Sequence, residues 1–459
     1  MLKLSRNCLA THALVDSRGD VISWDHITGL LALQQSEGVK FANKLSPAHV
    51  TEWKKRKMKV KLAAQVMSTS VADALQLLMD IQLPEFQSSS ATIRFIRMVD
   101  KVFDKLNSRS PFIIGSKQAI TRNGIDEDER FFKEVEKELR ALRLFDGQTV
   151  ITSKSKCFVI GFITTMRATI GLARELFQQF ATHELWYFIP YRLCQDALEH
   201  FFGDIRARNG WCNNPTALQF MFSYRALLSN RFHLQGLSGG RNCIELVDDG
   251  DDVLPVDDDD GLLQSVADDT EKKCSAELLN QLFATSQPTL GKLNVIYYMA
   301  GWSARSVARQ IKCVDCRDAM FMDEPFDAGI GRLTLLKQRN GLMYASRSVY
   351  RVAFLAYQSL QLALAKTSGK PPTDRLLLPK LVNSVIAAVV EDRLMFTELR
   401  KQDAGSLLDA HLPKMVKGIT SKTIQAFLGH ISRTHNEVVM GAASNKRNQA
   451  TRLTIFKGL

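Results

Sequence analysis

Residues 195–216 decide how this chain is interpreted, because they combine a helix pattern with charged side chains at regular spacing. They run Gln195-Asp196-Ala197-Leu198-Glu199-His200-Phe201-Phe202, then Ile205-Arg206-Ala207-Arg208-Asn209-Gly210-Trp211 and Asn213-Asn214-Pro215-Thr216. One face of a helix is expected to be an apolar stripe of Leu198, Phe201, Phe202 and Ile205. A second face carries Asp196, Glu199 and Arg206, and Asn214-Pro215 is expected to cap the next helix. On spacing alone, the charged face fits solvent as well as a functional site.

The composition of the whole chain favours several folded domains and an anionic partner. The 459 residues exceed one ordinary core, and 45% of them are hydrophobic. The net charge is +12, yet the segment from Glu245 to Glu271 holds twelve acidic residues and no Lys or Arg, so the remainder carries +24. A body this basic points to nucleic acid, and the plain alternative is a solvated basic surface.

Neither secretion nor a membrane location is indicated. The first 19 residues contain Arg6, His12, Asp16 and Arg18 and lack the apolar core of a signal peptide. The cysteines are scattered, apart from Cys313 and Cys316, so reduced thiols in a cytosolic or nuclear compartment are expected, and we take the nucleus as the location. The most apolar stretch, residues 157–173, contains Arg167 and is shorter than the roughly 20 residues of a membrane span, so it predicts a buried helix.

Helical periodicity dominates the chain and predicts a mainly α fold. Helices are expected after Ser23, ending at Gly38, and after Ser46-Pro47, where a serine cap precedes a proline at the first helical position. Residues 60–78 predict one long amphipathic helix, residues 93–106 a second that ends before Pro111, and residues 126–129 the acidic first turn of a third. A short strand is expected at 149–152. Runs of aspartate in 237–272 predict an acidic disordered linker, and a further helical region follows it.

The segment 195–202 and its continuation resemble the start of the C-terminal RNase H-like segment of P-element-type transposases and the related THAP-domain proteins. That pattern is Ser-Gln-Asp-x-x-Glu-x-Phe-Phe, then Arg-x-x-x-Gly and Asn-Asn-Pro-Thr, and this chain departs from it only in having Cys194 for the serine. Upstream, residues 1–7 resemble another stretch of the same family's pattern, Leu-Leu-Lys-x-x-Arg-Asn. Parts of residues 22–109 resemble its GTP-binding insertion, at 22–24, 40–45, 57–65, 68–74 and 103–109. Residues 298–301 and 313–316 resemble the family's C-terminal helical region more loosely.

The resemblance implies five parts. Residues 1–14 are expected to be a remnant of the first RNase H-like half, and 15–190 the helical GTP-binding insertion domain. Residues 191–236 are expected to be the C-terminal fragment of the RNase H-like domain. The acidic disordered linker, 237–272, and a helical C-terminal domain, 273–459, complete the chain.

The resemblance also implies a guanine-nucleotide site, although the chain has no P-loop motif. By position, the guanine contacts fall on Phe103, Asp104 and Asn107, with Asp196 nearby, and the remaining contacts fall on Lys44, Val60 and Ser68. A carboxylate accepts two hydrogen bonds from guanine, an aromatic ring stacks on the base, and a lysine attracts phosphate. Ordinary explanations stay open: a surface acid for Asp104, a core ring for Phe103 and a solvated amine for Lys44.

By the same resemblance, Glu199 is the third carboxylate of an Asp-Asp-Glu metal site, and so a catalytic residue and a Mg²⁺ ligand. The two aspartates that act with it belong to the half of the fold that precedes residue 1, so we expect an N-terminally truncated, decayed or domesticated transposase that cannot cleave DNA alone. Two alternatives remain. The chain is an active transposase if an upstream region or a partner supplies both aspartates, or it is an interaction protein without nucleotide binding.

The expected partners are GTP, DNA held nonspecifically by basic surface, and a second copy in a possible homo-oligomer. The densest basic run, from Trp53-Lys54-Lys55-Arg56-Lys57 to Lys61, fits DNA phosphate and a solvated face equally well. Cys313 and Cys316 form half of a zinc site, for which His430 and His435 have a suitable spacing; two free thiols are the simpler alternative.

Overall fold

The computed structural model describes residues 1–113, 115–181, 185–208, 214–229, 288–311, 313–339, 341–366, 377–392, 394–397, 399 and 412–431. The described residues are mainly helical, which confirms the predicted fold class. The predicted acidic linker, residues 237–272, lies outside the described residues. The chain divides into two compact units, of which unit 1 comprises residues 1–33 and 42–254 and unit 2 comprises 34–41 and 255–459.

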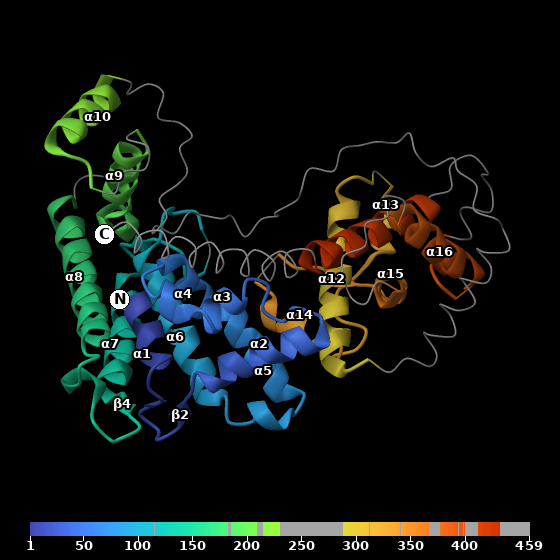
Figure 1. The fold of residues 1–459 in the computed structure, drawn as a ribbon, viewed down its shortest axis with the longest axis horizontal. Helices are drawn as coiled ribbons and strands as arrows, with labels where there is room; N and C mark the ends of the chain where they lie inside the picture. Colours follow the sequence, from blue (N-terminus) through green and yellow to red (C-terminus); the bar gives the residue numbers. More distant parts are fainter. Residues whose placement is uncertain are drawn as a thin grey trace, which may run out of the picture. The chain divides into compact units, whose positions relative to one another are not determined.

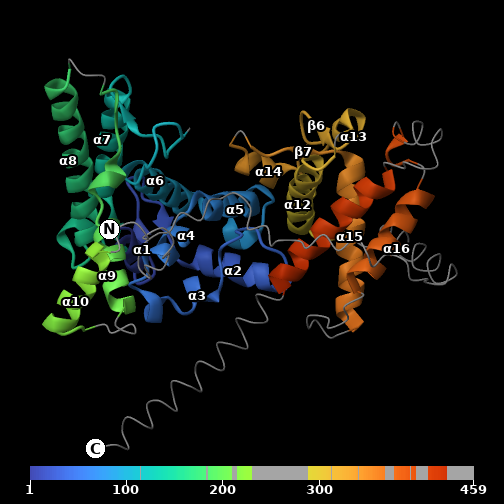
Figure 2. The ribbon, with the colours of Figure 1, turned by 90° about the horizontal axis from the view of Figure 1, so that it is seen from above.

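Unit 1 is a set of packed helices, and the described chain also has three very short antiparallel sheets (Figures 1 and 2). Its α-helices are α1 (Leu2–Leu9), α2 (Asp25–Glu37), α3 (Pro47–Val50), α4 (Val60–Val66), α5 (Thr69–Asp80), α6 (Ser90–Leu106), α7 (Ile125–Ala141), α8 (Cys157–Gln179), α9 (Asp196–Arg208) and α10 (Ala217–Ser229). Short 3-10 turns are η1 (Trp53–Arg56), η2 (Pro84–Phe86), η3 (Val150–Thr152) and η4 (Pro190–Leu193).

Two of those sheets belong to unit 1 and join segments that are distant in sequence. β1 (Leu14–Val15) lies between β2 (Val21–Ile22) and β4 (Arg143–Leu144), with Leu14 opposite both Ile22 and Leu144. β3 (Ile120–Thr121) pairs with β5 (Tyr187–Phe188). The sheets therefore fasten loops between helices, and the helices form the core. The third sheet, β6 (Phe321–Met322) with β7 (Tyr344–Ala345), belongs to unit 2.

The core of unit 1 is built around α5 and α6, which pack against each other. α6 buries Ile93, Ile96 and Val99 at three-residue steps, and α5 buries Leu75 and Leu78. Burying each such side chain contributes about 1.5–3 kcal/mol relative to exposure, so this pair of helices forms a rigid support. An ion pair of 3.0 Å between Arg97 and the buried Asp73 adds a polar tie between the two helices.

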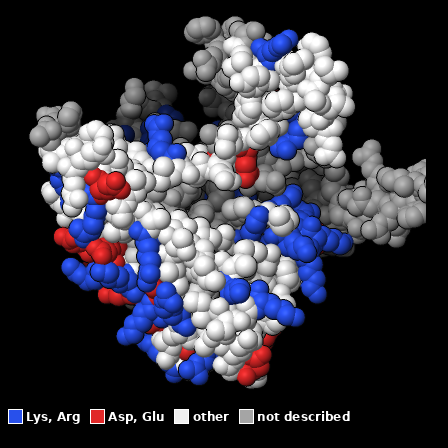
Figure 3. All heavy atoms as spheres, turned by 90° about the vertical axis from the view of Figure 1, so that its left-hand side faces the viewer, with Lys and Arg blue, Asp and Glu red and all other residues white. Residues whose placement is uncertain are grey.

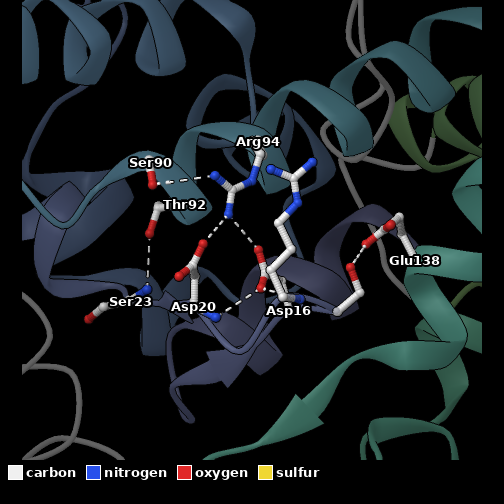
Figure 4. Close-up of polar contacts among 9 residues, drawn as sticks. Asp16, Asp20, Ser23, Ser90, Thr92, Arg94 and Glu138 are labelled. Carbon is white, nitrogen blue, oxygen red and sulfur yellow. Dashed lines mark hydrogen bonds and ion pairs between the residues drawn. The ribbon is translucent and has the colours of Figure 1, made fainter.

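The beginning of α6 is tied to the β1–β2 turn by Arg94 (Figure 4). Its guanidinium lies between Asp16, at 2.7 Å, and Asp20, at 2.6 Å. The backbone N–H of Ser23 donates to the Thr92 hydroxyl at 3.1 Å. These contacts fix the hairpin on α6, and they lie at the opposite end of α6 from Asp104.

Helices α7 and α8 pack side by side, and Figure 1 shows them at one edge of unit 1. α8 buries Phe158, Phe162 and Met166 on one face. Residues 157–179 and 60–80 are both long and apolar enough to cross a membrane by length and composition, with 44% and 56% of the most apolar window buried inside the chain. A core helix passes the same test, so this is weak evidence for a span.

Helix starts and stops follow the sequence at several places. α2 ends at Gly38, whose φ of +69° suits glycine, and α7 begins with Asp126, Glu127 and Asp128. At the start of α3, Ser46 is the N-cap, Pro47 is the first helical residue, and the Ser46 and His49 side chains form a capping box. Two predictions are wrong: residues 60–78 are split into α4 and α5 at Met67 and Ser68, and 149–152 form η3 instead of a strand.

Unit 2 contains α12 (Leu290–Ala308), α13 (Val314–Asp318), α14 (Arg332–Lys337), α15 (Arg347–Lys366), α16 (Leu377–Glu391) and a further helix over residues 412–431. α15 packs against both α12 and α16. Aromatic rings from α12 and α15 meet in its core, where Tyr297, Phe326 and Tyr350 lie with ring centroids 5.3–5.9 Å apart. Burial raises the pKa of Tyr297 to about 12, so this hydroxyl stays protonated and donates to the Ala345 carbonyl.

Candidate functional site

The break between α4 and α5 creates a helix start inside unit 1. The Ser68 hydroxyl donates to the Gln65 carbonyl at 2.9 Å, which closes a local turn and leaves the first N–H groups of α5 without that hydroxyl. Asp100 of α6 takes the place of a cap. Its Oδ2 accepts from the Thr69 backbone N–H at 2.7 Å and also from the Thr69 hydroxyl. A carboxylate at a helix N-terminus is favourable because the orphan N–H groups and the helix dipole are both positive.

Asp104 lies one helical turn after Asp100, on the same side of α6. The Ser116 hydroxyl donates to Asp104 Oδ2 at 3.0 Å, so the loop after α6 also contributes to this place. Asn107 ends the helix, with its backbone N–H donating to the Phe103 carbonyl at 3.0 Å. The structure therefore groups Ser68, Phe103, Asp104 and Asn107 around the C-terminal half of α6, with Phe103 half-buried.

The two aspartates of this cluster repel each other. Burial, and then the neighbouring Asp104 charge, raise the pKa of Asp100 to about 6, although the bonds from Thr69 and the charge of Lys117 act in the opposite direction. The cluster therefore pairs an easily protonated carboxylate, Asp100, with a second carboxylate one helical turn away, Asp104. We call Thr69, Asp100, Asp104, Ser116 and Lys117 the α6 acidic cluster.

Asp196 is connected to the end of α6 through Arg109. The guanidinium lies 3.7 Å from Asp196 Oδ2 and 3.8 Å from the centre of the Tyr191 ring. The Tyr191 backbone N–H donates to the Ser108 carbonyl at 3.3 Å. Burial raises the pKa of the Tyr191 hydroxyl and of the Cys194 thiol. The first turn of α9, which carries Asp196, thus lies near the C-terminal end of α6.

Two further expected nucleotide residues precede α5 in the chain. Lys44 is exposed in the segment that precedes α3, and Val60 is the half-exposed first residue of α4.

The segment between α3 and α4 carries the basic run, which we call the basic loop, Trp53–Lys59. Lys54, Lys55, Lys57 and Lys59 are exposed. Two residues of α1 hold the loop in place. The buried Arg6 donates to the Lys57 carbonyl at 3.2 Å, and Asn7 donates to the same oxygen at 3.3 Å.

Aromatic contacts complete the anchor of the basic loop. The Trp53 ring lies edge-on to Trp24, with the ring centroids 6.4 Å apart. The Arg6 guanidinium lies over the Trp53 ring, 5.8 Å from its centroid, and makes a cation–π contact. Arg56 pairs with Glu52 at 3.1 Å, and the four exposed lysines carry the remaining positive charge of the loop. On the face of the molecule drawn in Figure 3, Lys and Arg atoms gather in one dense group, apart from regions where both signs are mixed.

Glu199 lies exposed in the first turn of α9. Within the residues that the structure describes, no three His, Cys, Asp or Glu side chains converge as a metal site. The expected apolar stripe of α9 is only partly buried: Ile205 is 1% exposed, whereas Leu198 is 58% and Phe202 46% exposed. α9 packs on α10, where the Phe201 ring lies edge-on to Tyr224 and the Phe202 ring lies 6.4 Å from Phe220, between ring centroids.

The cap of α10 is also shifted from the expected Asn214-Pro215. Thr216 occupies this position, since the Gln219 N–H donates to its hydroxyl at 3.3 Å and its own N–H donates to the Gln219 side chain. Cys313 and Cys316 are free thiols at the start of α13, and Cys316 is buried. Of the two histidines suggested as zinc ligands, His430 is in the helix 412–431, and His435 lies outside the described residues.

Several residues of the site were given no role from the sequence. Thr69 and Arg109 lie in stretches that resemble the family, whereas Asp100, Ser116 and Tyr191 belong to no motif. The one available signal was the four-residue spacing of Asp100 and Asp104 in a strongly predicted helix, which places both carboxylates on one face.

Comparison with known proteins gives a consistent assignment for three parts of the chain. Residues 1–119 match the family described as TNP-like, GTP-binding insertion domain, and 191–225 match TNP-like, RNase H C-terminal domain. Residues 279–433 match the C-terminal domain of DNA transposase THAP9.

Two curated relatives match over longer stretches. Human DNA transposase THAP9 is 24% identical over 372 residues, 77% of this chain and 39% of the relative. The Drosophila melanogaster transposable element P transposase is 25% identical over 248 residues, 53% of this chain and 30% of the relative. The chain thus spans less than half the length of either. A chain in the solved Drosophila P element transposase strand transfer complex is similar at a TM-score of 0.44 and 25% identity, over 50% of each chain.

The class of protein is therefore transposase-related, with a GTP-binding insertion domain, a C-terminal RNase H part and a helical C-terminal domain. The chain belongs to the P element/THAP9 transposase family.

Proposed function

We propose that this chain binds GTP in unit 1, between the C-terminal half of α6 and the start of α5. The observation that carries the proposal is the match of residues 1–119 to a GTP-binding insertion domain, together with the grouping of Ser68, Phe103, Asp104 and Asn107. The Asp104 carboxylate is suited to accept from guanine N1–H and its amino group. The half-buried Phe103 ring offers a stacking surface, and Asp196 closes the site through Arg109.

The test is calorimetric titration with GTP and with ATP. The parent is expected to prefer GTP, and Asp104→Asn to lose guanine recognition because an amide cannot accept both hydrogen bonds. Asp126→Asn is the matched control, since this carboxylate of α7 is 76% exposed. Equal GTP affinity of Asp104→Asn and the parent would refute the assignment of Asp104.

We further propose that the basic loop binds DNA phosphate nonspecifically. Four exposed lysines on a loop fixed by Arg6, Asn7 and Trp53 form a preorganised cationic surface, which suits the phosphate backbone. Nuclear location and self-association remain part of this proposal. They fit a DNA-directed protein and are tested by imaging and by light scattering.

Strand cleavage is a second candidate function, suggested by the names of the two relatives, both transposases. Glu199 would then act as a Mg²⁺ ligand with two further carboxylates supplied by an upstream region or by a partner chain. We propose that the chain on its own binds nucleotide and DNA without cleaving.

A further inference from the structure

We propose that Asp100 is a positioning residue for the nucleotide site, fixing the start of α5, and with it Ser68, relative to Asp104. The inference rests on the proposed GTP binding. It concerns a residue to which we assign no contact with the nucleotide, because Asp100 Oδ2 already accepts from the Thr69 N–H and hydroxyl.

The first step is the connection between α5 and Asp100. A helix N-terminus leaves several N–H groups without partners, and a side-chain oxygen normally takes one of them. The neighbouring Ser68 hydroxyl is turned to the Gln65 carbonyl, at 2.9 Å. Asp100 supplies the oxygen instead, and it does so from another helix. The start of α5 is therefore placed by α6 and not by its own sequence.

The second step is the connection between Asp100 and Asp104. They are four residues apart on one helix, so the helix sets their separation. Asp104 is held in turn by the Ser116 hydroxyl at 3.0 Å. Ser68 is linked to Asp104 through Thr69 and Asp100. In this series, the pair of hydrogen bonds from Thr69 to Asp100 is the link that neither the covalent chain nor a helix sets. One turn further along α5, an ion pair of 3.0 Å between Arg97 and Asp73 also joins the two helices. We therefore expect loss of the Thr69 hydrogen bonds to release only the first turn of α5 from α6.

The third step concerns cost. A buried carboxylate beside a second carboxylate opposes folding, because burial and like charge both disfavour the ionised form. An asparagine at this position would accept from the Thr69 N–H without that cost. A carboxylate in this place is therefore better explained by its stronger, charge-assisted hold on Thr69 than by stability.

The experiment measures GTP affinity by calorimetry for Thr69→Val, Asp100→Ala, Asp100→Asn and the double variant Thr69→Val/Asp100→Ala. Asp100→Ala should weaken binding by about tenfold, the loss expected for a charge-assisted hydrogen-bonding group. Asp100→Asn should recover most of it, since its amide oxygen still accepts. The double variant should bind no more weakly than Asp100→Ala alone, because both changes break the same joint. Asp80→Ala, at the exposed far end of α5, is the control and should bind like the parent.

The outcomes separate the inference from the proposed function. A parent chain that binds no GTP overturns the proposed function and this inference with it. A parent that binds GTP, with Thr69→Val and Asp100→Ala at parental affinity, overturns the inference alone. Additive losses in the double variant, or an Asp100→Asn variant as weak as Asp100→Ala, also overturn it. If Asp100→Ala does not fold, Thr69→Val, which keeps the backbone N–H and the side-chain shape, decides the question.

Discussion

Replacing Asp100 by asparagine should stabilise unit 1 at neutral pH, by up to about 3 kcal/mol. Burial, and then the charge of Asp104, raise the pKa of Asp100 from 3.8 to about 6 in the folded chain. At about 1.4 kcal/mol for each pH unit, this difference corresponds to about 3 kcal/mol. An asparagine has nearly the same shape, does not ionise, and keeps an acceptor for the Thr69 N–H.

The sign of the pH dependence follows from the direction of that pKa change. The folded chain holds the Asp100 proton more tightly than the unfolded chain does. The stability contributed by the protonated group is therefore fully present below the unfolded pKa of 3.8, and it is lost as the pH rises through about 6. The variant lacks this titration. The difference in unfolding free energy between variant and parent should be small near about pH 4, grow to about pH 6 and stay constant above it.

The assay is urea unfolding at a series of pH values, with the transition of unit 1 followed by pulsed hydrogen exchange of peptides from α6. Asp80→Asn, an exposed carboxylate at the end of α5, serves as the control and should track the parent at each pH. A stability difference that is the same at all pH values, or an Asp100→Asn variant less stable than the parent above about pH 6.5, would refute the reasoning. It would mean that the bonds from Thr69 outweigh the burial of the charge.

Three further predictions concern DNA. Alanine in place of Lys54, Lys55, Lys57 and Lys59 should reduce the slope of log affinity against log salt by about 3 to 4, at about 0.9 per phosphate contact; a slope equal to the parent's would exclude the basic loop as the contact surface. The matched control replaces Lys133, Lys137, Lys154 and Lys156, which are also exposed. Deleting residues 245–271, which carry twelve acidic side chains, should tighten DNA binding if this segment competes for the basic surface, and unchanged affinity would remove that idea. The chain should not nick terminal-repeat DNA with Mg²⁺ or Mn²⁺, because one carboxylate holds such ions weakly; nicking by the parent but not by Glu199→Gln would show that the chain finds its other metal ligands.

The sequence predicts the helices well where the pattern is local. Gly38 ends α2, Ser46 caps α3 and acidic residues begin α7, as the patterns indicated. These features depend on backbone conformation and on the helix dipole, which neighbouring residues alone determine. The apolar stripe of α9 is buried at Ile205 and exposed at Leu198 and Phe202, because burial depends on what packs against a helix, and the apolar pattern does not carry that information.

The split of residues 60–80 shows why the candidate site was only partly predictable. Apolar residues continue at helical spacing through Met67, so periodicity favours one helix. The break is stabilised from outside: Asp100, 31 residues later, accepts from Thr69 and offsets the helical bonds that the break removes. The family resemblance identifies Ser68 and Asp104 as site residues because their positions match the family's motifs. It does not say which residues of this chain contact them. Asp100 becomes visible only when α5 and α6 are placed together, and a buried acid without a motif is the kind of residue that sequence patterns leave unassigned. If Asp100→Asn stabilises unit 1 and still binds GTP somewhat more weakly than the parent, the carboxylate of Asp100 costs stability and improves the geometry of the site.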